Sequence, residues 1–194
     1  MALDANAWTT VAAVKQALKI DSGDTDHDQE IEDLINACYL MLEGYIHHPL
    51  KATDYTEYYD GDGTNSLVLR KYPINSVASI YDDIDRVFAA TELVAAADYV
   101  IDNEEEVGTV RLFQNTAIFQ KGIKNIKITY NAGYTTIPKD AARACIMLVS
   151  YYFNRQGSEG MTAQSIGGKS ESYVDEALPL YIRQMVNKYK EWCV

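Results

Sequence analysis

Three short runs of the sequence place oxygen-bearing side chains at spacings that occur in metal and acid–base sites. In the first, Asp60, Asp62 and Thr64 occupy alternate positions, as the leading ligands of a calcium loop do. The twelfth position counted from Asp60 is Lys71, where such a loop needs a bidentate glutamate, and the flanks have the pattern of strands. We therefore interpret 60–65 as a polar hairpin turn without a metal.

The other two runs, Asp82, Asp83 and Asp85 with 104–106, could supply a carboxylate pair for general acid–base catalysis. Runs of charged residues at the ends of strands usually form solvent-exposed turns. Nothing in the surrounding sequence would raise the pKa of a carboxyl group here, so we do not expect catalysis. The adjacent histidines at 47–48 diverge in direction on a helix, so they are not expected to share a metal.

Cysteine spacing and glycine-rich segments also lack the patterns of a catalytic site. Cys38, Cys145 and Cys193 are far apart in the sequence, and the first two fall on apolar helix faces, where free cysteine behaves as a small hydrophobe. The Gly-Gly-Lys-Ser fragment at 167–170 lacks the upstream glycine and the strand of a phosphate-binding loop. We predict that the protein is not an enzyme and binds no metal or cofactor.

The length and composition are those of a small folded protein. A chain of 194 residues favours one domain, with two small ones as the alternative, and 47% hydrophobic residues suffice for a core. The net charge of -11 argues against tight binding of nucleic acid. It suits a surface along which DNA passes without being bound. Neither a leader peptide nor a long apolar run is recognised, so we expect reduced cysteines, a cytosolic setting and no membrane contact.

Two predicted helices carry apolar residues on two sides. In the central helix, 28–48, one stripe comprises Ile31, Leu34, Ile35, Cys38, Leu42 and Tyr45, and a second comprises Ala37, Leu40, Met41 and Gly44. Asp28 is the expected N-cap, and Pro49 ends the helix. The helix after Pro138 has a similar pattern, with Leu148 and Tyr151 on its second face. A helix of this kind needs two neighbours.

The middle of the chain has a different pattern. Runs 55–59 and 66–70 predict a β-hairpin, and further strands are expected at 76–81, 99–101, 107–113 and 123–130. The predicted fold class is α+β: a helical bundle core of about four helices, with an inserted small antiparallel β-sheet or barrel. We assign 1–194 as a single domain, with a helical frame at 9–50 and 138–194 and the β insertion at 51–137. The Gly- and Ser-rich 157–175 is expected to be a flexible loop.

Several segments, in order, resemble the head-tail connector (adaptor, or head-completion) proteins of long-tailed bacteriophages. No single motif is specific, and the weight lies in their order and spacing. The segments are 9–21, 28–45, 69–77 with its strand, proline and Ser-Val turn, 130–144 with Asn-Ala-Gly-Tyr and Ile-Pro-Lys-Asp, 154–155, 170–173 and 178–190.

The resemblance implies a structural subunit of the virion neck, made in the host bacterial cytoplasm. About a dozen copies would form a ring between the portal protein of the filled head and a downstream neck or tail-completion protein, extending the DNA channel. We expect a ring contact at Ala37, Leu40, Met41, Leu148 and Tyr151, since two-sided apolar helices leave surface for neighbours. For portal docking we expect Tyr173, Arg183, Lys188, Tyr189 and Trp192, with 157–175 becoming ordered on binding.

Alternatives remain open from the sequence. The last helix, which begins near Pro179, could simply complete the helical frame instead of docking on the portal. The protein could be another phage structural or binding protein, such as a tail-completion or decoration factor, or a metal-dependent hydrolase. Images of particles would separate the structural classes, because a neck protein localises to one vertex.

Overall fold

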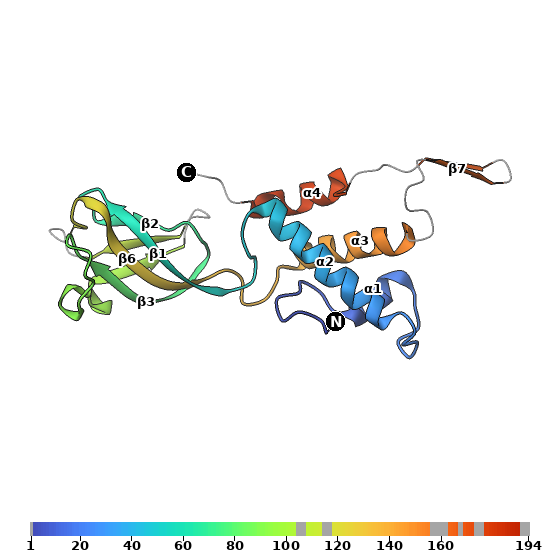
Figure 1. The fold of residues 1–194 in the computed structure, drawn as a ribbon, viewed down its shortest axis with the longest axis horizontal. Helices are drawn as coiled ribbons and strands as arrows, with labels where there is room; N and C mark the ends of the chain where they lie inside the picture. Colours follow the sequence, from blue (N-terminus) through green and yellow to red (C-terminus); the bar gives the residue numbers. More distant parts are fainter. Residues whose placement is uncertain are drawn as a thin grey trace. The chain divides into compact units, whose positions relative to one another are not determined.

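A computed structural model describes residues 2–103, 108–113, 118–155, 163–166, 169–172 and 177–190. The chain divides into two compact units (Figure 1). Residues 1–48 and 137–194 make the first, which we call the helical unit, and residues 49–136 make the second, the β unit. Whether 1–194 folds cooperatively as a single domain stays a prediction.

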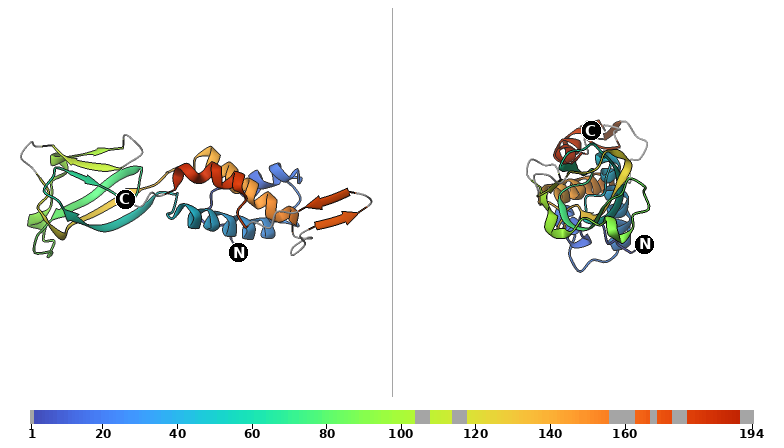
Figure 2. Two further views of the ribbon diagram at one scale, coloured as in Figure 1. Left: turned by 90° about the horizontal axis from the view of Figure 1, so that it is seen from above. Right: turned by 90° about the vertical axis from the view of Figure 1, so that its left-hand side faces the viewer.

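The helical unit contains α1 (Val11–Leu18), α2 (Asp28–Ile46), α3 (Lys139–Arg155) and α4 (Leu180–Val186), the last continued by the 3-10 turn η5 (Asn187–Tyr189). Helix α1 is capped by Thr10, whose hydroxyl accepts a hydrogen bond of 3.3 Å from the Ala13 N–H. The left view of Figure 2 shows the helices side by side, and α2 and α3 pack on each other.

Both ends of α2 differ from the prediction, because the N-cap is His27 and the helix stops at Ile46, two residues before the predicted end. His27 is the N-cap, without a side-chain cap hydrogen bond, and Asp28 is the first helical residue. The Asp28 carboxylate is ion-paired with the Lys15 ammonium, so it joins α1 to α2 instead of capping the helix. At the other end His47 has a φ of 67°, the left-handed conformation that ends many helices.

The core of the helical unit comes from one side of each long helix. From α2 the buried side chains are Ile31, Ile35, Cys38, Tyr39, Leu42 and Ile46. Four of them belong to the predicted first stripe, whose Leu34 and Tyr45 are half-buried. From α3 they are Ala141, Ala144, Cys145, Leu148 and Val149. The alanines of α3 have small side chains, which lets α2 approach closely.

The β unit contains two three-stranded antiparallel sheets. The first has the order β1 (Thr53–Gly61), β6 (Gly122–Ala132), β3 (Ile74–Asp82). The second has the order β2 (Ser66–Val68), β5 (Thr109–Leu112), β4 (Tyr99–Asp102). The 3-10 turns η1 (Ala90–Glu92) and η2 (Ala96–Asp98) lie between β3 and β4.

The predicted hairpin between 55–59 and 66–70 is wrong. Strand β1 pairs with β6, with Tyr55 opposite Tyr130, whereas β2 pairs with β5, with Leu67 opposite Val110. The turn at 60–65 therefore connects two sheets rather than two paired strands. Its Asp62 carboxylate accepts hydrogen bonds from the N–H and the hydroxyl of Thr64, so the local turn is stabilised without a partner strand.

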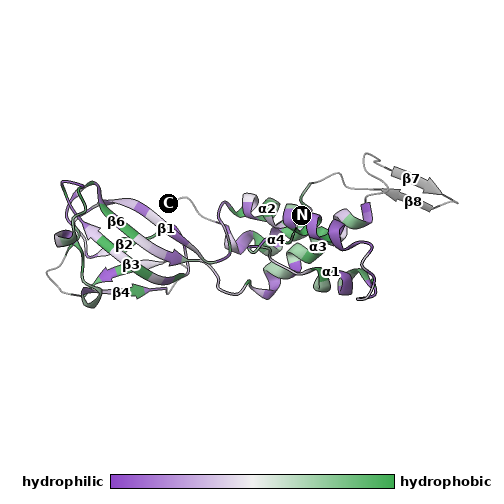
Figure 3. Ribbon diagram, turned by 60° about the horizontal axis from the view of Figure 1, so that its bottom comes forward, coloured by the Kyte–Doolittle hydropathy of each residue, from purple (hydrophilic) through white to green (hydrophobic). Residues whose placement is uncertain are grey.

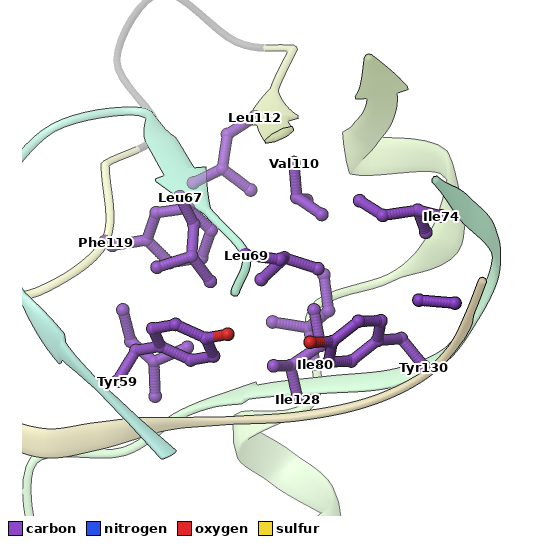
Figure 4. Close-up of a cluster of buried hydrophobic side chains, with 12 residues drawn as sticks. Tyr59, Leu67, Leu69, Ile74, Ile80, Val110, Leu112, Phe119, Ile128 and Tyr130 are labelled. Carbon is purple, nitrogen blue, oxygen red and sulfur yellow. The ribbon is translucent and has the colours of Figure 1, made fainter. Parts of the chain in front are cut away.

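Side chains from both sheets meet in one buried cluster (Figure 4). Leu67 and Val110 come from one sheet, and Ile80, Ile128 and Tyr130 come from the other. Figure 3 shows hydrophobic and hydrophilic stretches alternating along the strands, as expected where one face of a sheet is buried. The β unit thus has a hydrophobic core of its own.

The prediction of a helical bundle core with a small inserted sheet is wrong. In the described residues eight strands accompany four α-helices, and the two sheets enclose their own core, so the β region is a principal part of the fold. The chain is α+β overall. The sequence pattern underestimated the β region because its strands pair with strands that are far away in the sequence. A local pattern of residues does not indicate such pairing.

Strands β7 (Ala163–Ile166) and β8 (Lys169–Ser172) pair antiparallel between α3 and α4. The prediction of a flexible loop is therefore wrong for these segments, and the remainder of 157–175 lies outside the described residues. No helix in the described part of the chain is long and apolar enough to span a bilayer.

Candidate subunit interface

The second stripe of α2 is left on the surface. Leu40 is 56% exposed, Ala37 and Gly44 are also exposed, and Met41 is partly buried. These positions lie on the opposite side of the helix from the buried Cys38 and its neighbours, since residues three and four apart share a face. We call Asp33, Ala37, Leu40 and Gly44 the outer face of α2.

Gly44 leaves open space on this face. A Cβ placed at Gly44 would have no atom within 4 Å apart from the helix itself and its chain neighbours, so the fold of one copy does not require glycine here. On the outer face of α2, the large apolar side chain of Leu40 therefore lies between two small residues, Ala37 and Gly44. This arrangement gives a projecting side chain with room beside it for a close partner.

Helix α3 also has a face that its own unit does not cover. A shallow groove of about 300 Å³ is formed over it by α3, α1 and α4. The lining residues are Arg143, Ile146, Met147, Ser150, Tyr151 and Asn154 from α3, Ala17 from α1 and Tyr181 from α4. We call this the α3 groove. Its lining is mixed: Ala17, Ile146 and Met147 are apolar, whereas Ser150, Asn154 and the exposed Arg143 are polar.

The sequence identified part of this surface only. Tyr151 was predicted for the subunit contact and lines the groove, whereas Leu148, also predicted, is fully buried in the helical unit and is a core residue. Arg143 and Met147 were not identified. The signal was present in the sequence, because Arg143, Met147 and Tyr151 follow one another at intervals of four along a single helix face.

The residues predicted for portal docking have internal contacts. Tyr189 is 6% exposed, and its hydroxyl donates a hydrogen bond of 2.7 Å to Asp140. The Lys188 ammonium lies 2.8 Å from the other oxygen of Asp140, and His48 Nε2 lies 2.7 Å from the Tyr189 carbonyl oxygen. These contacts join η5 to the start of α3 and the end of α2.

Of the other three residues predicted for portal docking, the structure describes one. Arg183 is half-buried on α4, while Tyr173 and Trp192 lie outside the described residues. Helix α4 exposes Leu180 and Tyr181, at 60% and 46%. The last helix therefore does pack on the helical frame, as one alternative expected, and it also presents apolar surface at its first turn.

The carboxylates considered for catalysis have structural partners. Asp82 accepts hydrogen bonds from the Gln120 N–H at 2.7 Å and from the Asn125 amide at 3.0 Å. Burial raises the pKa of Asp82 despite these donors. Asp83 accepts from three backbone N–H groups of the loop that follows, and the hydrogen bond from Phe88 is the main cause of its lowered pKa.

These two carboxylates therefore hold loops of the β unit in place. In the described residues no group of three or more His, Cys, Asp or Glu side chains is arranged to hold a metal ion. Cys38 and Cys145 are buried, and burial raises the pKa of Cys38 to about 12 and that of Cys145 still further above the usual range. Thiols in this state are poor nucleophiles.

Solved structures of gene transfer agent (GTA) particles have a similar fold. A chain from the virion of a native GTA particle matches with a TM-score of 0.62 and 15% identity, covering 100% of this chain and 94% of the other. A chain from the neck of a native particle computed with C12 symmetry matches at 0.58 and 14%, covering 95% and 89%. A chain from the neck of an empty particle computed with C6 symmetry matches at 0.57 and 15%, covering 95% and 90%.

At these identities the likeness establishes the fold. No protein with a curated description matches the chain. The family model named head completion protein matches residues 7–192, which is nearly the whole chain and includes both units. The resemblance predicted from the sequence is thereby confirmed: this chain belongs to the head completion protein family.

Proposed function

We propose that the protein is a structural subunit of the virion neck, where copies of it form a ring that joins the portal vertex of a DNA-filled head to the tail. The observation that carries the proposal is the exposed apolar surface of the helical unit, at Leu40 on α2 and in the α3 groove, in a chain whose family is named for head completion. The similar chains come from particle necks computed with C6 and C12 symmetry, which supports a ring of about twelve copies.

The charge of the protein suits a channel for DNA. With a net charge of -11, the chain offers few of the Lys and Arg contacts that bind phosphates by releasing counterions. DNA would pass such a ring without being retained. The proposed role needs no catalysis and no cofactor, and the hydrogen-bonded carboxylates of the β unit are consistent with this.

The portal protein and a downstream neck or tail-completion protein are the proposed partners. For the portal we retain Arg183 and Lys188 as candidate contacts, because Lys188 has a side chain that is 60% exposed although it is paired with Asp140. Tyr189 contributes by fixing this segment, since its own side chain is buried.

The test is to mix the purified protein with DNA-filled heads that lack tails and to image the vertex by electron microscopy. A ring of density at the portal vertex alone is the expected result. Density over the whole head would indicate a decoration protein, and binding only to tails would indicate a tail-completion factor. Either result would contradict the neck assignment.

A point variant tests the portal contact better than a truncation. Removing the chain after Leu178 would delete the buried Ile182 and Val186, and the helical unit would lose core packing together with any docking residue. Lys188→Ala keeps that core but removes the ion pair with Asp140, so thermal unfolding must show that the variant is folded. Lys19→Ala, at an exposed lysine of the same unit, is the control for the loss of one charge. Attachment weakened by the first variant alone would support the portal contact.

A further inference from the structure

The proposed ring needs two complementary surfaces on each copy. We propose that the outer face of α2 of one copy docks in the α3 groove of the next copy, so that Leu40 enters the groove between Ala17, Met147 and Tyr181. This inference rests on the proposed function and specifies which faces of the chain meet. Its evidence is the direction, the shape and the charge of the two surfaces.

Direction comes first. Helices α2 and α3 pack on each other through their buried sides, so their exposed sides point in opposite directions. A contact between two different surfaces on opposite sides of a subunit is heterologous, and it generates a ring when the rotation closes. A contact of one surface with itself would stop at two copies.

Shape agrees with this pairing. The outer face of α2 presents Leu40 between Ala37 and Gly44, and Gly44 has open space beside it. The α3 groove is a shallow recess in which Ala17, Ile146 and Met147 supply apolar surface. A projecting leucine flanked by small residues can enter such a recess, and the small residues let the two helices approach closely.

Charge favours the same pairing. Segment 21–33 carries many carboxylates and no lysine or arginine, and it ends at Asp33, which is exposed on the outer face of α2. In contrast, α3 carries Lys139, Arg143 and Arg155 against Asp140 alone, and Arg143 is exposed in the groove. Asp33 on the outer face and Arg143 in the groove carry opposite charges and would attract, whereas a contact between two α2 faces would bring two copies of Asp33 together.

Cysteine cross-linking on assembled particles tests the pairing. Leu40→Cys and Ala17→Cys replace exposed side chains, and all variants carry Cys193→Ser, while Cys38 and Cys145 are shielded by burial. Each variant is bound to tail-less heads and treated with a short bis-maleimide. The products are separated by denaturing electrophoresis. Ile123→Cys, 74% exposed in the β unit, replaces Ala17→Cys in the control double variant.

The expected result is specific to a head-to-tail contact. The double variant Leu40→Cys, Ala17→Cys should give a ladder of covalent multimers up to the ring size. An equal mixture of the two single variants should give dimers and nothing larger, because each chain carries one accessible thiol, and each single variant alone should remain monomeric. The control double variant should give no ladder.

Three results would overturn the inference. Dimers from Leu40→Cys alone would show that two α2 faces meet. Attachment of the double variant to heads without a ladder would show that the ring uses other surfaces, while the neck assignment would stand. If the wild-type protein attached to no head, the neck assignment itself would fail, and the face pairing would fail with it.

Discussion

The hydroxyl of Tyr189 donates a hydrogen bond of 2.7 Å to Oδ1 of Asp140, and the Lys188 ammonium lies 2.8 Å from Oδ2 of the same carboxylate. One carboxylate in the first turn of α3 thus binds the segment that follows α4. Because Tyr189 is buried, this contact belongs to the fold of one copy. Residues that the sequence suggested for docking therefore also stabilise the helical unit.

Tyr189→Phe should destabilise the helical unit. The variant keeps the ring but removes the donor, and the loss of a hydrogen bond to a charged group typically costs about 1.5–3 kcal/mol. The free energy of unfolding in urea, followed by the fluorescence of the buried Trp8, is the measurement. Tyr181→Phe, at an exposed tyrosine of the same unit, should change it by less than about 0.5 kcal/mol. Equal effects would contradict the structural role of Tyr189.

Asp140→Asn should alter the acid side of the stability profile. Burial would raise the pKa of Asp140, but hydrogen bonds from Lys188 and Tyr189 outweigh it and hold the pKa below its ordinary value of 3.8. A lowered folded-state pKa gives stability that is present above the unfolded value and is lost as pH falls below it. The wild type should therefore lose stability more steeply than Asp140→Asn below about pH 4, in urea unfolding at a series of pH values.

Substitutions at Gly44 separate the fold from the ring contact. Gly44→Ala should stabilise α2 by about 0.8–1 kcal/mol, because alanine is the better helix former and the added Cβ meets open space. Gly44→Gln should also stabilise the helix, yet its long side chain would block a close partner. We expect rings on tail-less heads with Ala and few or none with Gln, while thermal unfolding shows both variants to be stable. Normal rings with both would remove α2 from the contact.

Local patterns predicted the helices well and the sheets less well, for a physical reason. Four residues of the first stripe of α2 are buried, and Ala37, Leu40 and Gly44 of its second stripe are exposed, because the spacing of apolar residues fixes the faces of a helix directly. The partner of β1 is β6, more than sixty residues away, and only the three-dimensional packing selects it. The sequence near 60–65 offered a good hairpin turn, so the adjacent strands were wrongly paired.

The candidate surface shows the same limit. Leu148 and Tyr151 lie on neighbouring positions of one helix, yet Leu148 is core and Tyr151 lines the groove. Which apolar stripe of α3 is covered depends on where α1 and α4 lie, and this is not recorded in the periodicity of α3. The α3 groove itself depends on Ala17 and Tyr181, which come from distant segments.

The buried thiols provide a probe of cooperativity. Cys38 and Cys145 are covered by α2 and α3, and burial raises both pKa values, so neither should react with a thiol reagent at pH 8 while the helical unit is folded. If 1–194 is a single domain, the near-ultraviolet signal of the tyrosines, which lie in both units, should change in one step, at the urea concentration that exposes the thiols, in a background with Cys193→Ser. Separate transitions would show that the two units unfold independently.

Glu57 joins two tyrosines in the core of the β unit. The hydroxyls of Tyr59 and Tyr130 donate to the same carboxylate oxygen, at 2.5 and 2.6 Å, and Figure 4 shows the two hydroxyls directed toward each other. Glu57→Ala would leave buried hydroxyls without their acceptor, at a cost of about 1–3 kcal/mol for each unsatisfied group. Tyr130→Phe removes one donor only and should cost less, about 1–2 kcal/mol, in urea unfolding followed by circular dichroism of the sheets.

The same cluster predicts a loss of stability in alkali. Burial, followed by the hydrogen bond to Glu57, raises the pKa of Tyr130 well above its ordinary value of 10.0. A raised folded-state pKa gives stability that is complete below the unfolded value and is lost as pH rises above it, because the unfolded chain then releases its proton more readily. The wild type should lose stability above about pH 10, and Tyr130→Phe should lose less over the same range, with Tyr59 retaining part of the effect. Parallel profiles for the two proteins would show that Tyr130 ionises as readily in the folded chain as in the unfolded one.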